Sequence, residues 1–179
     1  MRKIVLTFGL LAGGILAATL LISLPFHDAI GFDRAMVLGY TYMVLAFLLI
    51  FFGVRSYRDN VAGGRLGFGR ALAVGALIGV VASSCYVLTW EVFYFGTKSD
   101  YIEKYQAHLI EKARQAGESP EAIAARQAEM AKLAQMYRNP LINSAITFLE
   151  PLPVALVVAL VTAGVLTRRK KAEPGPATA

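Results

Sequence analysis

The chain of 179 residues contains little of what a metal or redox site needs: one cysteine and two histidines. Cys85 has no cysteine partner, so an intramolecular disulfide is excluded, as is the quinone-linked disulfide chemistry of four-helix oxidoreductases. His27 and His108 lie far apart, with no His or Cys neighbours at ligand spacing. We therefore expect no metal and no other cofactor, and we interpret Cys85 as a small buried hydrophobic residue.

Charged residues are also scarce. They make up 17% of the chain, whereas soluble domains carry about a quarter. The hydrophobic share is 56% and the mean hydropathy is +0.55. The net charge of +6 comes from basic residues at the ends of apolar runs, which is typical of membrane topology signals. We therefore predict that the lipid bilayer is the main partner, and that nucleic acid is not one.

Four apolar segments, at about 4–24, 34–54, 70–95 and 141–167, match the length of a bilayer crossing. The first could be a cleaved signal peptide, since Ala17-Ala18-Thr19 offers a small-residue site. Its apolar run continues to Leu24, so we favour an uncleaved transmembrane helix. Asp33 is expected to cap the second helix. The prolines that follow Glu150 predict a kink in the fourth.

The segment 97–139 has balanced charge and predicts a helical hairpin between the third and fourth crossings. Apolar side chains form one stripe on each of its helices, running from Tyr101 to Ala116 and from Ile123 to Tyr137. The stripes could pack on each other or lie on the membrane surface. The alternative is that they dock a protein partner. Residues 1–171 are thus expected to form a single all-α membrane domain, followed by a disordered tail at 172–179.

The loop from Arg55 to Arg70 carries four arginines, and short basic loops stay on the cytoplasmic side. The basic end of the fourth segment repeats this signal, whereas the connection between the first two segments holds only Arg34. We predict that both termini are cytoplasmic and that the hairpin is periplasmic. The expected cytoplasmic anchors are Arg55, Arg58, Arg65, Arg70, Arg168 and Arg169.

Small residues recur at four-residue spacing, which lets helix backbones approach closely in lipid. Gly9 and Gly13 form such a pair in the first segment, and Gly75 and Gly79 form another in the third. Ala155, Ala159 and Ala163 form a ladder in the fourth. The two glycine pairs are expected to lie at similar depth and to pack the first and third helices together within one chain, with a homodimer as the alternative.

Two carboxylates are expected within the outer membrane layer. At about 1.5 Å per residue, Glu91 lies about 30 Å from Arg70, and Glu150 lies about 27 Å from Arg168. They predict an outward-facing polar cup, in which two carboxylates could share a proton or hold a cation. The alternative is that both are hydrated, or pair with Arg34 or hairpin lysines. The polar residues expected beside them are Thr19, Ser23, His27, Asn143 and Thr147.

The run Phe52–Asn60, followed by Gly63–Leu72, resembles the central signature of a bacterial membrane family catalogued as domain of unknown function 4199. The segments Lys3–Gly14 and Asn139–Arg169 are similar to it as well, so the resemblance covers nearly the whole chain. It implies a multi-pass protein of the bacterial inner membrane. It implies no activity and no catalytic residue.

Serine-hydrolase and phosphate-loop motifs are absent, so we do not expect an enzyme. The leading hypothesis is a non-enzymatic accessory or interaction subunit with a protein partner at the hairpin. The alternative is a small proton- or cation-coupled transporter that uses Glu91 and Glu150.

Overall fold

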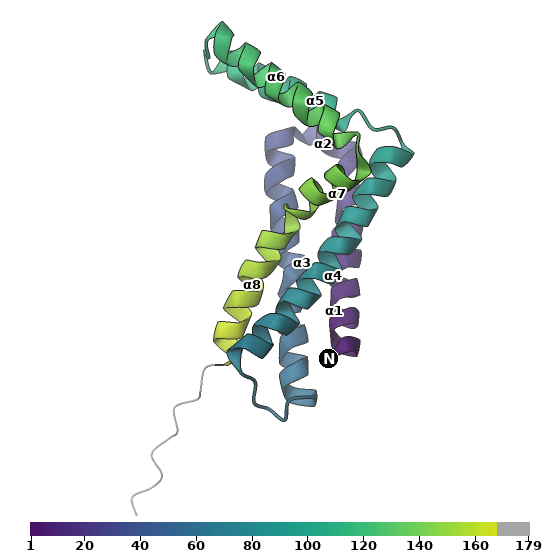
Figure 1. Cartoon of the computed structure of the whole chain (residues 1–179), viewed down its shortest axis with the longest axis vertical. Helices are drawn as coiled ribbons and strands as arrows, with labels where there is room; N and C mark the ends of the chain where they lie inside the picture. Colours follow the sequence, from purple (N-terminus) through teal and green to yellow (C-terminus); the bar gives the residue numbers. More distant parts are fainter. Residues whose placement is uncertain (168–179) are drawn as a thin grey trace, which may run out of the picture.

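The computed structural model describes residues 1–167, apart from the side chains of Pro25, His27 and Asp28, and all its regular structure is helical (Figure 1). The predicted all-α fold is therefore confirmed. The predicted tail at 172–179 and the anchors Arg168 and Arg169 lie outside the described residues. The helices are α1 (Arg2–Ser23), η1 (Leu24–Phe26), α2 (His27–Ile30), α3 (Phe32–Asn60), α4 (Phe68–Gly96), α5 (Tyr101–Gln115), α6 (Pro120–Tyr137), α7 (Pro140–Phe148) and α8 (Pro151–Leu166).

Four helical segments are long and apolar enough to cross a membrane: α1, α3, α4 and the consecutive pair α7–α8. They correspond to the four predicted segments. Helix α3 continues beyond the expected end near residue 54, because Tyr57 still packs into the core. Arg55 and Arg58 consequently lie in the last turns of α3, where both form ion pairs with Asp59.

Helix α4 is the centre of the bundle, since it packs against α1, α3, α7 and α8. Gly9 and Gly13 of α1 face Val81 and Cys85 of α4, and a β-carbon at Gly13 would lie only 2.6 Å from the Cys85 Cβ atom. Gly9 and Gly13 thus let α1 and α4 approach closely within one chain.

The glycines of α4 have a different partner. Gly75 and Gly79 receive Ala159 and Ala155 of α8, with the Ala155 side chain 2.7 Å from the position of a β-carbon at Gly79. The pairs in α1 and α4 therefore do not face each other. Instead, α4 uses its own glycines on the side where α8 presents the alanine ladder.

The fourth crossing is interrupted where the prolines predict it. Helix α7 ends at Phe148, and α8 begins at Pro151. Pro151 and Pro153 have no N–H, so the carbonyls of Thr147 and Leu149 lose the donor that a continuous helix would place four residues on. Thr147 instead accepts a bond from the Glu150 amide at 3.3 Å, which tightens the turn. Glu150 lies at this break.

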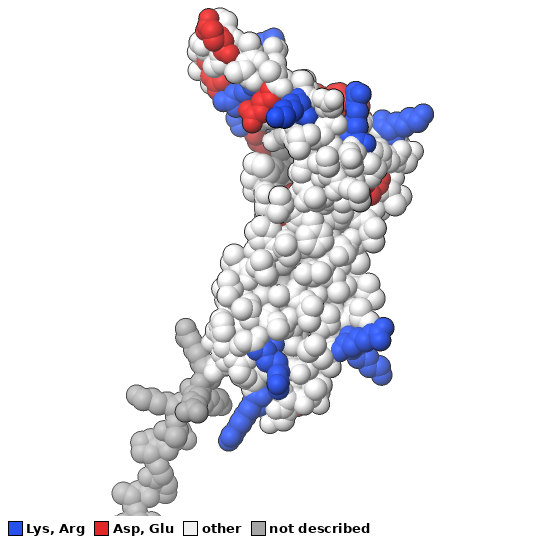
Figure 2. Space-filling view, in the orientation of Figure 1, with Lys and Arg blue, Asp and Glu red and all other residues white. Residues whose placement is uncertain are grey.

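The hairpin of α5 and α6 projects from the end of the bundle that is opposite Met1 and the α3–α4 loop (Figure 1). Gly117 allows the turn because its φ is +73°, and the Ser119 hydroxyl caps α6 by accepting from the Ala122 amide. Among the charged side chains visible in the space-filling view, those at the end of the bundle with the α3–α4 loop are basic, whereas the hairpin carries both acids and bases (Figure 2).

The expected cap at Asp33 is wrong. The N-cap of α3 is Gly31, with φ +82°, and Asp33 lies in the first turn of the helix. Its carboxylate bonds instead to side chains of α5.

Candidate functional site

A cavity of about 450 Å³ lies between the membrane bundle and the hairpin. Its walls come from the ends of α1, α3 and α4 that are nearest the hairpin, from the inner faces of α5 and α6, and from the α7–α8 break. This volume is within the usual range for small-molecule sites. The residues that line the cavity include Thr19, Ser23, Phe32, Asp33, Gly39, Tyr86, Trp90, Tyr101, Tyr105, Lys112, Tyr137, Thr147 and Glu150.

Glu150 provides the carboxylate at the break between α7 and α8. Its Oε2 atom accepts a hydrogen bond of 3.0 Å from the Tyr86 hydroxyl of α4. Among the described residues, no Lys or Arg forms an ion pair with Glu150. By contrast, the hydroxyls of Thr19 and Ser23 donate to carbonyls of their own helix. Glu150 is thus the polar group in the wall with capacity to bind a further donor or a cation.

A buried amide holds the neighbouring tryptophan in place. Asn143 of α7 is fully buried, and its Oδ1 atom accepts from Trp90 Nε1 at 3.0 Å and from the Thr147 hydroxyl at 3.1 Å. Its Nδ2 atom donates to the Tyr137 carbonyl at 3.2 Å. Asn143 therefore joins α4, α6 and α7 directly behind the cavity wall, and it fixes the indole ring that lines the cavity.

Aromatic rings form much of the wall on the hairpin side. Tyr101 of α5 meets Trp90 edge to face, with ring centroids 5.1 Å apart, and Phe32 of α3 at 5.6 Å. Tyr105 stacks on Tyr101 at 6.5 Å. Burial raises the pKa of the Tyr101 phenol to about 12, and the negative charge of Glu150 acts in the same direction. Burial also raises the pKa of Tyr137.

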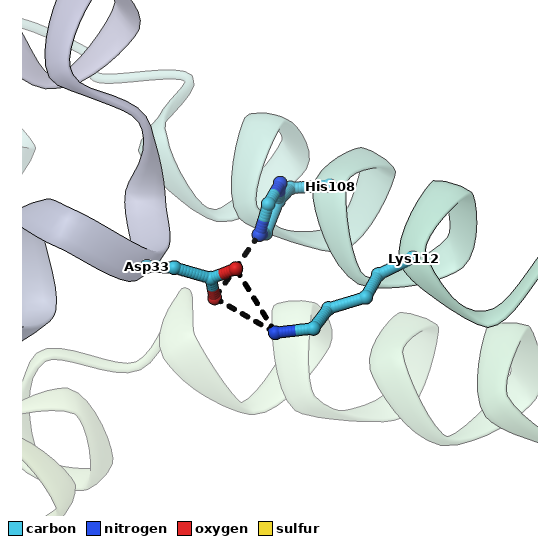
Figure 3. Close-up of polar contacts among 3 residues, drawn as sticks. All are labelled: Asp33, His108 and Lys112. Carbon is cyan, nitrogen blue, oxygen red and sulfur yellow. Dashed lines mark hydrogen bonds and ion pairs between the residues drawn. The ribbon is translucent and has the colours of Figure 1, made fainter. Parts of the chain in front are cut away.

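An ion pair fastens the hairpin to the bundle beside this wall (Figure 3). Lys112 Nζ of α5 donates to both carboxylate oxygens of Asp33 at 3.0 Å. The His108 ring nitrogen Nε2 lies 3.5 Å from the same carboxylate, and the His108 ring stacks on Phe32. Asp33 and Lys112 both line the cavity, and their charges cancel there.

Reversing the charge of Lys112 is expected to loosen the hairpin without unfolding the bundle. In Lys112→Asp, two carboxylates would repel each other at the point where Asp33 joins α3 to α5. Because the pair is exposed, global stability should change little. Backbone amides of α5 should exchange hydrogen about two- to fivefold faster.

The swapped pair Lys112→Asp with Asp33→Lys should restore slow exchange, and Lys132→Asp, at another exposed lysine of the hairpin, should leave it unchanged. Equal exchange in Lys112→Asp and the unaltered protein would contradict the role of this ion pair.

The cavity gathers part of the predicted polar cup. Thr19, Ser23, Thr147 and Glu150 line it, and Asn143 lies directly behind it. His27 belongs to α2, and its side chain is outside the described part of the structure.

Glu91 is not among the described residues that line the cavity. It lies beside Ser144 of α7, and its Oε1 atom is buried without a hydrogen-bond partner among the described residues. Of the two glutamates predicted to share one site, only Glu150 therefore lines the cavity.

The aromatic wall was not predicted as a site. Trp90 belongs to the third apolar segment, and Tyr101 and Tyr105 belong to the apolar stripe predicted for the first hairpin helix. Ile102, Ile110 and Ala113 of the α5 stripe are buried, whereas α6 has no buried residue. The tyrosines of the α5 stripe, however, turn toward the cavity. Tyr86 lies inside the third apolar segment, and its hydroxyl there is the signal that could have identified the partner of Glu150.

Comparison with known families gives a match to the family described as protein of unknown function (DUF4199), over residues 7–168. The chain belongs to the DUF4199 family. The matched range contains every residue that lines the cavity. No curated protein and no solved structure matches this chain. The feature of this DUF4199 protein that bears on its function is therefore the cavity itself.

Proposed function

We propose that this protein is a non-enzymatic, multi-pass accessory protein of the bacterial inner membrane that binds a small ligand in the cavity under its hairpin. The observation that carries the proposal is the cavity of about 450 Å³, whose apolar and aromatic wall contains one carboxylate without a basic partner among the described residues. Pockets of this size and composition, with few polar groups, are typical ligand sites.

The orientation follows from charge. The charged side chains visible at the end of the bundle with the α3–α4 loop are basic (Figure 2), and the N-terminus and the end of α8 lie at the same end (Figure 1). Under the positive-inside rule this end is cytoplasmic, so both termini are cytoplasmic and the hairpin is periplasmic. The cavity then opens at the periplasmic side, where it can take a ligand from the periplasm or the outer leaflet. A protein partner at the hairpin and a homodimer both remain compatible with this placement.

A second candidate function is proton- or cation-coupled transport. The feature that favours it is the helix break at Glu150, where two prolines leave carbonyls without their usual helical donors beside a carboxylate. In this version Glu150 carries the coupled ion, and Glu91 acts outside the cavity. Transport would require a path from the cavity to the loop end, whereas the middle of the bundle is closed by Phe47, Ile50 and Ile78, all fully buried. Binding is therefore the better-supported function.

The proposed function predicts saturable binding of a small probe that depends on an open cavity. Full-length protein in nanodiscs would be titrated with three probes built on one ring: phenyltrimethylammonium, tert-butylbenzene and benzenesulfonate. Equilibrium dialysis gives the stoichiometry, after correction for partition into protein-free nanodiscs. Emission from Trp90, the only tryptophan of the chain, reports on the cavity wall. At least one probe should bind one to one and change this emission.

Gly39→Phe should block the binding, because Gly39 lines the cavity and a β-carbon there meets nothing within 4 Å. Gly14→Phe is the matched control, since Gly14 is equally open but lies outside the cavity. If no probe binds, or if both variants bind as the unaltered protein does, the proposed function is wrong.

A further inference from the structure

The charges around the cavity determine which ligand it suits. Three ionisable side chains of fixed sign line it, namely Asp33, Lys112 and Glu150. Asp33 and Lys112 neutralise each other across 3.0 Å at the hairpin. Glu150 has a hydroxyl donor, Tyr86, and no basic partner among the described residues. With Glu150 ionised, the wall carries one uncompensated negative charge, and a ligand with one positive charge would balance it.

The rings supply the second half of a cation site. Cations bind over aromatic faces, where the ring quadrupole is negative, and cages of several rings are the usual way to hold an alkylated ammonium. Here Phe32, Trp90, Tyr101 and Tyr105 come from three helices. Tyr101 and Tyr105 are nearly parallel, at 9°, and the rings of Phe32 and Trp90 are inclined to Tyr101. Trp90 and Tyr101 meet at 80°, and Phe32 and Tyr101 at 62°. Ring faces therefore point in several directions, as a cage requires, rather than forming one flat stack.

The geometry also argues against an inorganic ion. A small metal cation prefers several oxygen ligands close together. Of the two carboxylates in the described wall, Asp33 is bonded to Lys112, and the Thr19 and Ser23 hydroxyls bond to their own helix. An anion would face Glu150 unpaired, because Lys112 is already held by Asp33. A ligand that is both apolar and singly positive satisfies the carboxylate and the rings together.

We propose that the cavity binds a monovalent organic cation, an alkylated ammonium with an apolar body about the size of a phenyl ring, with Glu150 as its counter-ion. The rings of Trp90 and Tyr101 contact the cationic head, and Tyr86 holds the Glu150 carboxylate toward it. This inference rests on the proposed function, because it names the class of ligand for the same cavity.

The three probes described above separate the two claims. Phenyltrimethylammonium and tert-butylbenzene have the same shape, because a carbon replaces the charged nitrogen, so their affinity ratio isolates the charge. We expect the cation to bind at least about tenfold more tightly than the neutral probe, and benzenesulfonate not to bind. Equal affinities for cation and neutral probe, both blocked by Gly39→Phe, would overturn the cation inference and leave cavity binding intact. Absence of all binding would overturn both.

Glu150→Gln tests the counter-ion. It keeps the shape of the side chain and a hydrogen-bond acceptor for Tyr86, so the preference for the cation should fall to about twofold or less, while tert-butylbenzene binds as before. Glu91→Gln removes a carboxylate outside the cavity and should keep the full preference. If Glu150→Gln keeps a tenfold preference, Glu150 is not the counter-ion and the assignment fails. Retained binding of tert-butylbenzene shows in the same titration that the variant is folded.

An alkylated ammonium could reach the cavity as a free solute or as a lipid headgroup. The titration is therefore run in nanodiscs of phosphatidylglycerol, which has no amine, and repeated with one third phosphatidylcholine. A several-fold weaker apparent affinity for phenyltrimethylammonium in the second lipid identifies the headgroup as a competitor. An unchanged affinity identifies a soluble cation. Both results support the same binding chemistry and differ in its source.

Discussion

Gly13→Val is expected to destabilise the bundle by about 1–3 kcal/mol, which is typical of overpacking in a close-packed interior. Even the β-carbon alone would lie 2.6 Å from Cβ and 2.8 Å from Sγ of Cys85, and 3.3 Å from the Ala82 backbone. Neither neighbour is the far end of a flexible side chain, so α1 and α4 must move apart. The free energy of unfolding would be measured in mixed detergent micelles as sodium dodecyl sulfate is increased.

Gly14→Val is the matched control for this substitution. Gly14 is the adjacent residue of α1, but a β-carbon there meets nothing within 4 Å. Valine is also the better helix former, so this variant should be as stable as the unaltered protein or slightly more stable. Adding Cys85→Gly to Gly13→Val should recover part of the loss, because it removes the atoms that collide. Equal loss in the two valine variants would contradict the α1–α4 packing described above.

Asn143→Leu is expected to cost about 1–3 kcal/mol, although leucine is more apolar and of similar size. The substitution leaves Trp90 Nε1 and the Thr147 hydroxyl without the acceptor that both share, in a place where no water replaces it cheaply. It also frees the Tyr137 carbonyl, which ties α7 to the end of α6. Unfolding in mixed micelles, followed by circular dichroism, gives the loss of stability.

A double-mutant cycle isolates the shared hydrogen bond. In the background of Trp90→Phe, which has no ring N–H to satisfy, Asn143→Leu should cost measurably less than it does alone. Additive losses in the two single variants would show that the hydrogen bond from Trp90 to Asn143 contributes nothing to stability.

The positions of the elements along the chain could be predicted, because hydropathy and proline act locally. The four crossings, the hairpin and the break before Pro151 all follow from runs of apolar residues and from peptide nitrogens that cannot donate. The cap of α3 could not be predicted in the same way. Asp33 is a good N-cap by type, but Gly31 takes the cap because its φ of +82° turns the chain, and the carboxylate of Asp33 is left for Lys112.

The direction in which a side chain points was harder to infer than its depth. Helix α4 is apolar on all sides, so it has no polar face to show which way Glu91 projects. Successive residues of a helix differ by about 100° in direction, and Trp90 lines the cavity while its neighbour Glu91 lies beside Ser144. The break between α7 and α8 also sets the direction of Glu150 independently of α7. The prediction used only depth in the membrane, and it therefore placed Glu91 and Glu150 in one site although their side chains face different neighbours.

The cavity wall runs from Thr19 in the first crossing to Glu150 in the last, and the hairpin closes it. During synthesis the wall is incomplete until α5, α6 and the start of α8 have been made and have folded onto the earlier helices. A molecule that occupies the finished cavity binds the completed fold and no earlier form. By mass action it stabilises that fold, and the gain grows with the logarithm of the ratio of its concentration to its dissociation constant. Occupancy would thus lengthen the lifetime of correctly assembled copies, and the abundance of this protein in the membrane would follow the supply of its ligand.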